Sequence, residues 1–145
     1  MADLCIVIPL YNEENNLHSL TGRLNKAMES IRLDWMVLFV DDGSTDQTLK
    51  IIGDLASRNP SFRVLSLTRN FGHQAALMAG LDHADADAVI TMDGDLQDPP
   101  ELIPELIGKW KEGFPVVYAR RTNFRKDHLL KRWLSMFYYY ILRSF

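Results

Sequence analysis

Short apolar runs alternate along the chain with segments whose apolar residues recur every three or four positions. The runs are bounded by polar, Gly or Pro residues, and they predict strands over residues 4–8, 36–40, 62–67, 88–92 and 115–119. The first run shows no polar alternation, which predicts a strand buried on both faces. The helical spacing predicts helices over about 14–31, 45–58, 74–83 and 99–112.

This alternation of strand and helix predicts a three-layer α/β fold with a mostly parallel sheet and right-handed crossovers. In such sheets ligands bind beyond the carboxyl ends of the strands, where the strand order reverses. The residues that directly follow each strand are therefore the first candidates for chemistry.

Three of the predicted strands end in acidic segments. These segments cover residues 9–14, 41–46 and 93–100. Carboxylates gathered at one edge would repel one another, and a divalent cation would relieve that repulsion. Asp93 and Asp95 can offer two hard oxygen ligands and Gln97 a third, which suits Mg²⁺ or Mn²⁺ completed by waters and substrate phosphates.

Some of these acidic residues also have a purely structural interpretation. Asp42-Gly43 is typical of a turn, and Asp46 falls in the predicted first turn of a helix, where a carboxylate is favourable. For Asp41, Asp42 and Asp46 both interpretations remain open. For Asp93 and Asp95 we favour the cation site.

Four motifs, in order, resemble one protein family. They are VIPLYNEE at 7–14, VDDGSTD at 40–46, RNFG at 69–72 and MDGDLQDPP at 92–100. Together they resemble the family 2 glycosyltransferases with the GT-A fold, over about residues 4–145. The RNFG and DLQDPP segments are similar to the polyprenyl-phosphate branch, which includes dolichol-phosphate mannose synthase and the bacterial undecaprenyl-phosphate glycosyltransferases.

The resemblance implies a metal-dependent, inverting glycosyltransferase that takes a UDP- or GDP-linked sugar. The resemblance implies that Pro9, Tyr11, Glu13 and Asp41 bind the nucleotide. Further candidates for substrate binding at the same edge are Asp42, Arg69 and Gly72. Asp93, Asp95 and Gln97 would hold Mg²⁺ or Mn²⁺ on the diphosphate, and Asp93 and Asp95 are also catalytic candidates together with Arg121. For Arg69, contact with the substrate and a purely solvated position beside a turn at Gly72 are equally open.

Charge divides the chain of 145 residues into two unlike parts. Residues 1–108 carry 7 basic and 17 acidic side chains, a balance of −10, whereas residues 109–145 carry 9 basic and 2 acidic, a balance of +7. The 47% hydrophobic content excludes a disordered chain, and the single cysteine excludes a disulfide framework and a cysteine-based zinc site. No apolar run is long enough to span a bilayer.

The basic part is also aromatic. Apolar residues in it follow helical spacing, at positions 130, 133, 134, 137, 138, 141, 142 and 145. This pattern is typical of a helix that lies in a membrane interface, although packing on the domain's own sheet or an oligomer contact would give the same pattern. With a polyprenyl phosphate as the acceptor that the resemblance implies, the candidate acceptor-binding bases are Arg120, Arg121, Lys131 and Arg132.

We therefore expect a nucleotide-sugar- and metal-binding domain over residues 1–119 and the start of an acceptor or membrane-interface region over 120–145. The expected location is cytoplasmic, at the cytoplasmic face of a membrane, in cell-envelope synthesis. Nucleic acid is not an expected partner, whereas a homo-oligomer is possible. Related enzymes usually continue beyond this length, so we expect the acceptor side to be cut short.

Two rival functions remain open. A receiver-type signalling domain has a similar size, but its acidic pair should follow the first strand, and here the pair follows the second. A non-catalytic nucleotide-binding or membrane-associated fragment would fit a shortened chain. A dinucleotide-binding enzyme is disfavoured because no G-x-G-x-x-G motif follows the first strand.

Overall fold

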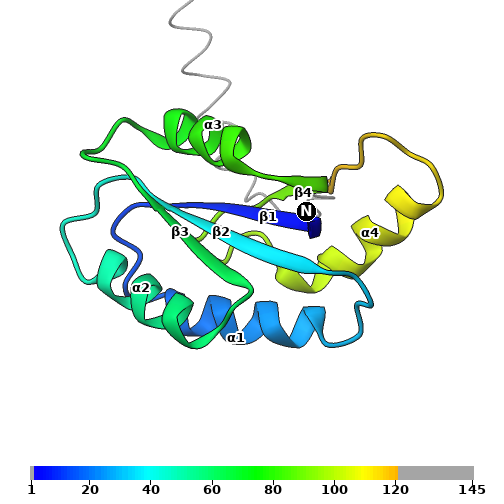
Figure 1. Ribbon diagram of the computed structural model, residues 1–145, viewed down its shortest axis with the longest axis horizontal. Coiled ribbons are helices and arrows are strands. Elements are labelled where there is room, and N and C mark those ends of the chain that lie inside the picture. Colours follow the sequence, from blue (N-terminus) through cyan, green and yellow to red (C-terminus); the bar gives the residue numbers. More distant parts are fainter. Residues whose placement is uncertain (1, 121–145) are drawn as a thin grey trace, which may run out of the picture.

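A computed structural model describes residues 2–120 of the chain (Figure 1). Its strands are β1 (Ala2–Leu10), β2 (Trp35–Asp41), β3 (Phe62–Ser66) and β4 (Ala86–Thr91). Its helices are α1 (Leu17–Met28), α2 (Thr48–Arg58), α3 (His73–His83) and α4 (Ile103–Lys111), the last preceded by the short 3₁₀ helix η1 (Pro100–Leu102). The alternation of strand and helix predicted over residues 4–112 is confirmed.

The four described strands form one parallel sheet in the order β3-β2-β1-β4. In the register of this sheet Leu10 lies beside Asp41, and Val7 lies beside Thr91. The carboxyl ends of β1, β2 and β4 therefore share one edge, as predicted. The strand order reverses at β1, where β4 joins on the side away from β2.

Helices cover both faces of the sheet, and this makes the three layers (Figure 1). Alternate residues of β1 point to opposite sides: Ile6 and Ile8 pack in the core with α1, α2 and α4, whereas Cys5 and Val7 pack in the smaller core under α3. The predicted burial of β1 on both faces is confirmed. Burial also raises the pKa of the Cys5 thiol, as expected for an inert core cysteine.

The predicted fifth strand is wrong. Residues 115–119 have no regular secondary structure, and Val116 and Tyr118 are 79% and 81% exposed. The reason is that an apolar run becomes a strand only when a neighbour pairs with its backbone. Among residues 2–120 the free edge of β4 has no such partner, and its side chains alternate between half-buried and exposed.

Within residues 2–120 no helix combines the length and the apolar character needed to cross a membrane. The boundary predicted at 119/120 lies at the end of the described residues, so the second predicted domain falls outside them, apart from Arg120.

Candidate functional site

A cleft of about 250 Å³ opens at the carboxyl edge of the sheet, among the segments that follow the four strands. Five predicted substrate-binding residues border it: Pro9, Tyr11, Glu13, Asp42 and Gly72. Asp93 and Asp95 form part of the wall that follows β4. The structure thus brings together residues from four separate loops at the place that parallel-sheet topology favours for ligands.

Hydrogen bonds made by Asn12 join the loop after β1 to the loop after β2. Asn12 has a φ of 56°, in the left-handed region that asparagine tolerates. Its amide donates to Ser44 Oγ at 3.0 Å, and its side-chain oxygen accepts from the Thr45 amide at 2.8 Å. Asn12 was not singled out from the sequence, because its role depends on a loop more than thirty residues away.

Glu13 and Glu14 continue this junction into the start of α2. The Glu13 amide donates to Thr48 Oγ1 at 2.8 Å, and its carboxylate accepts from the Asn16 side chain at 2.6 Å. The Glu14 carboxylate accepts from the Gln47 amide at 2.9 Å. These contacts hold the backbone next to Tyr11 in place. Tyr11 itself lies at the rim of the cleft and is 45% exposed.

Asp46 serves as a structural residue of the α2 start, one of its two predicted roles. Its carboxylate accepts from the Thr48 amide at 2.9 Å and the Glu14 amide at 3.2 Å. Desolvation is the largest single influence and acts to raise its pKa, but the hydrogen bonds from Thr48 and Glu14 together outweigh it and lower the pKa. The helix predicted from about residue 45 therefore begins at Thr48.

Asp41 and Asp42 lie below the acidic edge instead of on its surface. Their exposed fractions are 1% and 2%. Asp41 accepts from the Ser44 amide and from Ser66 Oγ, each at 3.4 Å, and it does not border the cleft. Asp42 borders the cleft, but its carboxylate oxygens accept the amides of Phe71 and Gly72.

The predicted metal ligands divide between two cavities. Asp93 and Asp95 face the cleft at the strand ends, with Asp95 Oδ1 accepting the Gln97 amide at 2.9 Å. Gln97 itself lines a different cavity. Among residues 2–120 no group of three His, Cys, Asp or Glu residues lies close enough together to hold a metal ion.

His73, at the start of α3 as predicted, also has a place in the cleft. Its Nε2 lies 3.6 Å from Asp93 Oδ1, and both side chains are about half exposed. No partner for His73 could be assigned from the sequence, since Asp93 is twenty residues further along the chain. A histidine beside this carboxylate adds a polar side chain to the wall of the cleft.

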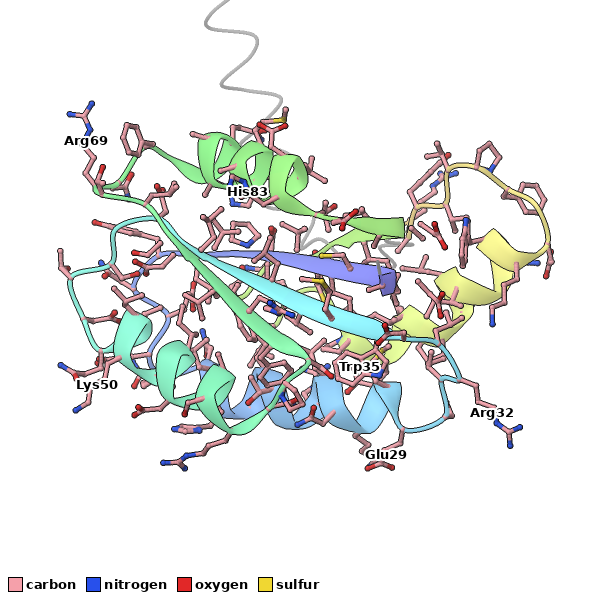
Figure 2. All side chains as sticks on the ribbon, in the orientation of Figure 1. Glu29, Arg32, Trp35, Lys50, Arg69 and His83 are labelled. Atoms are coloured by element: carbon pink, nitrogen blue, oxygen red, sulfur yellow. The ribbon has the colours of Figure 1, made fainter. Side chains whose placement is uncertain are left out.

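Arg69 lies at the outer rim. Its guanidinium stacks over the ring of Phe71, 4.8 Å from the ring centre. Figure 2 shows Arg69 pointing away from the body of the domain, and it does not border the cleft. This exposed position is the one expected for Arg69 as a solvated arginine beside a turn.

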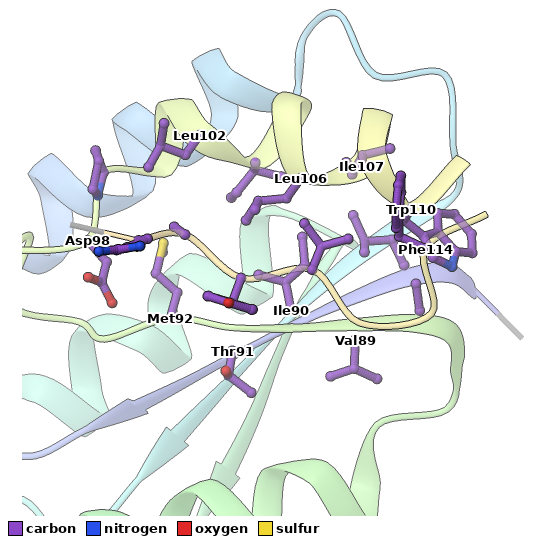
Figure 3. Close-up of a pocket in the computed structure, with 18 of the residues that line it drawn as sticks. Val89, Ile90, Thr91, Met92, Asp98, Leu102, Leu106, Ile107, Trp110 and Phe114 are labelled. Carbon is purple, nitrogen blue, oxygen red and sulfur yellow. The ribbon is translucent and has the colours of Figure 1, made fainter. Parts of the chain in front are cut away.

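The second cavity, of about 780 Å³, separates β4 from α4 (Figure 3). Ile90, Met92, Leu106, Trp110 and Phe114 give it apolar walls. Arg120, a predicted acceptor-binding residue, also lines it. Arg121, Lys131 and Arg132 lie outside the described residues.

Residues 5–145 match the family described as glycosyl transferase family 2. The chain belongs to this family. The GT-A fold, the four motifs and the acidic edge of this family 2 chain agree with that membership. The resemblance that the sequence motifs indicated is therefore confirmed.

Relatives of this family 2 chain include a bactoprenol glucosyl transferase and an undecaprenyl-phosphate sugar transferase. It is 43% identical over 136 residues to the bactoprenol glucosyl transferase of Shigella phage SfV, covering 94% of this chain and 44% of that protein. It is 43% identical over 129 residues to the undecaprenyl-phosphate 4-deoxy-4-formamido-L-arabinose transferase of Salmonella choleraesuis, covering 88% and 39%. The family 2 chain thus spans less than half the length of the curated relatives that it matches.

Solved structures show the same fold. The mannosyltransferase PcManGT of Pyrobaculum calidifontis, in complex with GDP-Man and Mn²⁺, superposes with a TM-score of 0.66 at 24% identity. The match covers 80% of this family 2 chain and 34% of that structure.

Proposed function

We propose that this chain is the donor-binding part of a glycosyltransferase that moves a sugar from a UDP- or GDP-linked donor to a polyprenyl phosphate. The observation that carries the proposal is the cleft at the reversal of strand order, with Tyr11 at its rim and with Asp93 and Asp95 in the wall that follows β4. Membership of family 2 and relatives that act on bactoprenol or undecaprenyl phosphate support it.

The nucleotide would enter where the loops after β1 and β2 meet. Tyr11 offers a ring face on which a base can stack, and its exposed fraction of 45% leaves that face accessible. Pro9 and Glu13 border the same part of the cleft, and a carboxylate can accept from a base N–H or a ribose hydroxyl. The buried Asp41 could act on the base only through the turn that it holds.

Asp93 and Asp95 are the residues that would hold a divalent cation. Two carboxylates on one cleft suit Mg²⁺, which proteins often bind through one or two carboxylates together with substrate phosphates. The bound ion would supply Lewis-acid stabilisation of the charge that develops on the leaving diphosphate. A ligand role for Gln97 needs its side chain to turn from the larger cavity to the cleft. The structure of a neighbour with GDP-Man and Mn²⁺ supports the choice of ligand class.

The acceptor would approach from the side of the basic C-terminal part. Arg120 is the described member of the bases predicted to bind its phosphate, followed by Arg121, Lys131 and Arg132. A polyprenyl phosphate is already an anion at neutral pH, so its oxygen can attack the anomeric carbon without a strong base. Alignment for in-line displacement would then supply most of the catalysis and would invert the anomeric centre. A lipid acceptor would put the reaction at a membrane surface, and we propose the cytoplasmic face.

Titration calorimetry with UDP, GDP and the corresponding nucleotide sugars tests the donor site. We expect one nucleotide to bind in the presence of Mn²⁺ and chelation with EDTA to weaken it strongly. Asp95→Asn should reduce the Mn²⁺-dependent affinity about tenfold or more, because it removes a charged ligand. Asp54→Asn, which makes the same charge change on the exposed face of α2, should leave the affinity within about twofold.

Two results would contradict the proposal. One is that no nucleotide binds to the wild-type chain with or without Mn²⁺. The other is that Asp95→Asn and Asp54→Asn bind equally well. Nucleotide binding without transfer to a polyprenyl phosphate would favour the alternative, a donor-binding fragment without turnover of its own.

A further inference from the structure

We propose that Asn12 is a positioning residue for Tyr11, the residue on which the nucleotide base would stack. The role rests on the proposed function and deepens it, because it concerns how the base-binding side of the cleft is held ready for a ligand. Asn12 does not border the cleft, whereas Tyr11 and Glu13, the residues before and after it, both do. An effect of Asn12 on a ligand would therefore pass through its neighbours.

The side chain of Asn12 binds the turn after β2. Its Oδ1 accepts from the Thr45 amide at 2.8 Å and from Thr45 Oγ1 at 3.3 Å. Its own amide donates to Ser44 Oγ at 3.0 Å. One residue thus uses both its backbone and its side chain on two consecutive residues of the turn. Contacts at two points fix the orientation of a segment as well as its distance.

The backbone of Asn12 is a second sign of this role. Its φ of 56° lies in the left-handed region, and within residues 2–120 only Leu96 shares a positive φ among the residues other than glycine. Most side chains are strained in this region, whereas asparagine tolerates it. A strained backbone persists only where its surroundings hold it. The bonds to Ser44 and Thr45 supply that hold, directly after Tyr11.

The turn that receives Asn12 is itself attached to the sheet. The Ser44 amide donates to the Asp41 carboxylate, 3.4 Å from each oxygen, and Asp41 is the buried last residue of β2. Glu13 has an anchor of its own, since its amide donates to Thr48 Oγ1. Loss of the Asn12 side chain should therefore leave Glu13 in place and free mainly the segment that carries Tyr11.

A tyrosine that is held in place before the ligand arrives costs less to bind. A side chain or loop that must be ordered on binding reduces the affinity by the free energy of that ordering. Tyr11 is exposed at the rim, so the protein around its ring restrains it only in part. The remaining restraint has to come from the backbone beside it, which Asn12 holds.

NMR relaxation of the chain without a ligand tests the hold itself. Asn12→Gly permits the same φ but removes Oδ1, so the order parameters of the Tyr11 and Thr45 amides should fall from about 0.85 towards about 0.6. Asn12→Asp keeps an oxygen acceptor and also tolerates a positive φ, so it should keep both values. Asn15→Gly, which removes an exposed asparagine that makes none of these bonds, is the matched control. Unchanged order at Tyr11 and Thr45 in Asn12→Gly would overturn the inference.

Calorimetry with the preferred nucleotide and Mn²⁺, at a temperature where circular dichroism shows each variant folded, tests the consequence for the donor. Asn12→Gly should weaken binding about five- to tenfold, since the ordering of Tyr11 is then deducted from the affinity. Asn12→Asp should stay within about threefold of the wild type and Asn15→Gly within about twofold. Equal losses in Asn12→Gly and Asn12→Asp would show that the bond to Thr45 does not carry the role, and they would overturn it.

A double-mutant cycle shows whether Asn12 acts through Tyr11. In the Tyr11→Ala background the ring is gone, so Asn12→Gly should weaken binding by less than about twofold further. The nucleotide concentration is raised there to match the weaker affinity. A purely structural role of Asn12 would instead give the same loss in both backgrounds, and that result would overturn the positioning of Tyr11.

The outcomes separate this inference from the proposed function. If the wild-type chain binds no nucleotide, the proposed function fails, and this role of Asn12 fails with it. Normal wild-type binding with equal affinity in Asn12→Gly overturns the role of Asn12 alone. Weakened affinity with unchanged order at Tyr11 and Thr45 would mean that Asn12 contacts the ligand directly, and it would overturn positioning as well.

Discussion

At the scale of single residues, close approach of α3 to the sheet depends on Gly80. A Cβ at this position would overlap the Val7 side chain and lie 2.9 Å from Val40 Cγ2. Val7 and Val40 are fully buried, so their methyl groups have little room to give way. Gly53 is also inside a helix, but nothing lies within 4 Å of the corresponding position.

This contrast predicts opposite effects of one substitution. Gly53→Ala should stabilise the protein by up to about 1 kcal/mol, since alanine has the higher helix propensity. Gly80→Ala gains the same propensity but overpacks the core under α3, and it should destabilise the protein by about 1–3 kcal/mol. Urea unfolding of both variants measures the difference, and equal stabilisation would show that α3 can shift away from the sheet without cost.

At the same scale, the acidic residues show that similar residues take different roles. Their types and order could be predicted from the motifs, and Asp93 and Asp95 do face the cleft. The sequence could not separate Asp41, which is buried beneath the turn, from Asp42, which binds the loop of residues 69–72. The distinction depends on partners some 25 to 30 residues away, and no local pattern records them.

At the scale of elements, one ion pair joins α1 to η1. Arg23 Nε donates to Glu101 Oε1 at 2.8 Å, and Nη2 donates to Oε2 at 2.6 Å. These hydrogen bonds from Arg23 lower the pKa of Glu101 from an ordinary 4.5 to about 2. The pair anchors the segment that leads from Asp93 and Asp95 into α4, on the face of the sheet opposite α3.

The depressed pKa predicts how stability depends on pH. Because the folded pKa of Glu101 is the lower one, its contribution is complete above about pH 4.5 and is lost as the pH falls towards 2. Glu101→Gln should therefore flatten the pH dependence of the free energy of unfolding between pH 5 and 2. Arg23→Gln should flatten it equally, and the double variant no further. If the free energy of unfolding of either single variant depended on pH as it does in the wild type, the ion pair would make no contribution to that dependence.

Elements also show where prediction from pattern succeeds and fails. The four βα units were predictable from the sequence. A helix buried on one face repeats its apolar residues every three or four positions, and a central strand buried on both faces is a continuous apolar run. The run at 115–119 is also mostly apolar, yet among residues 2–120 it finds no strand to pair with. Strand formation is a property of two segments, and a single run of sequence describes only one.

At the scale of the whole molecule, charge separates two regions of the chain. The acidic edge lies within residues 1–108, and the excess of bases lies within 109–145. For a transferase that moves a sugar from a nucleoside diphosphate to a lipid phosphate, this division would give each substrate its own side. It also predicts that any membrane binding is electrostatic and carried by the basic part.

Cosedimentation with vesicles tests that prediction. The chain should bind vesicles that contain phosphatidylglycerol more tightly than neutral ones, and binding should weaken as salt is raised. Each base removed near the surface costs about 1 kcal/mol, so Lys131→Ala and Arg132→Ala should each weaken binding on the order of fivefold. Lys50→Ala, on the exposed face of α2, is the matched control. Equal binding to neutral and anionic vesicles would contradict an electrostatic interface.

The sequence by itself determined the βα alternation, the parallel sheet with acidic strand ends at one edge, and the family. These follow from local periodicity and from residue types, which every stretch of chain carries with it. The tertiary structure decided which of those acidic residues meet: it brought Asp93 beside His73, turned Asp42 to the loop of residues 69–72, and left Arg69 at the rim. Such choices depend on the packing of segments distant in sequence, because the direction of a side chain is set by the neighbours that surround it in the folded state.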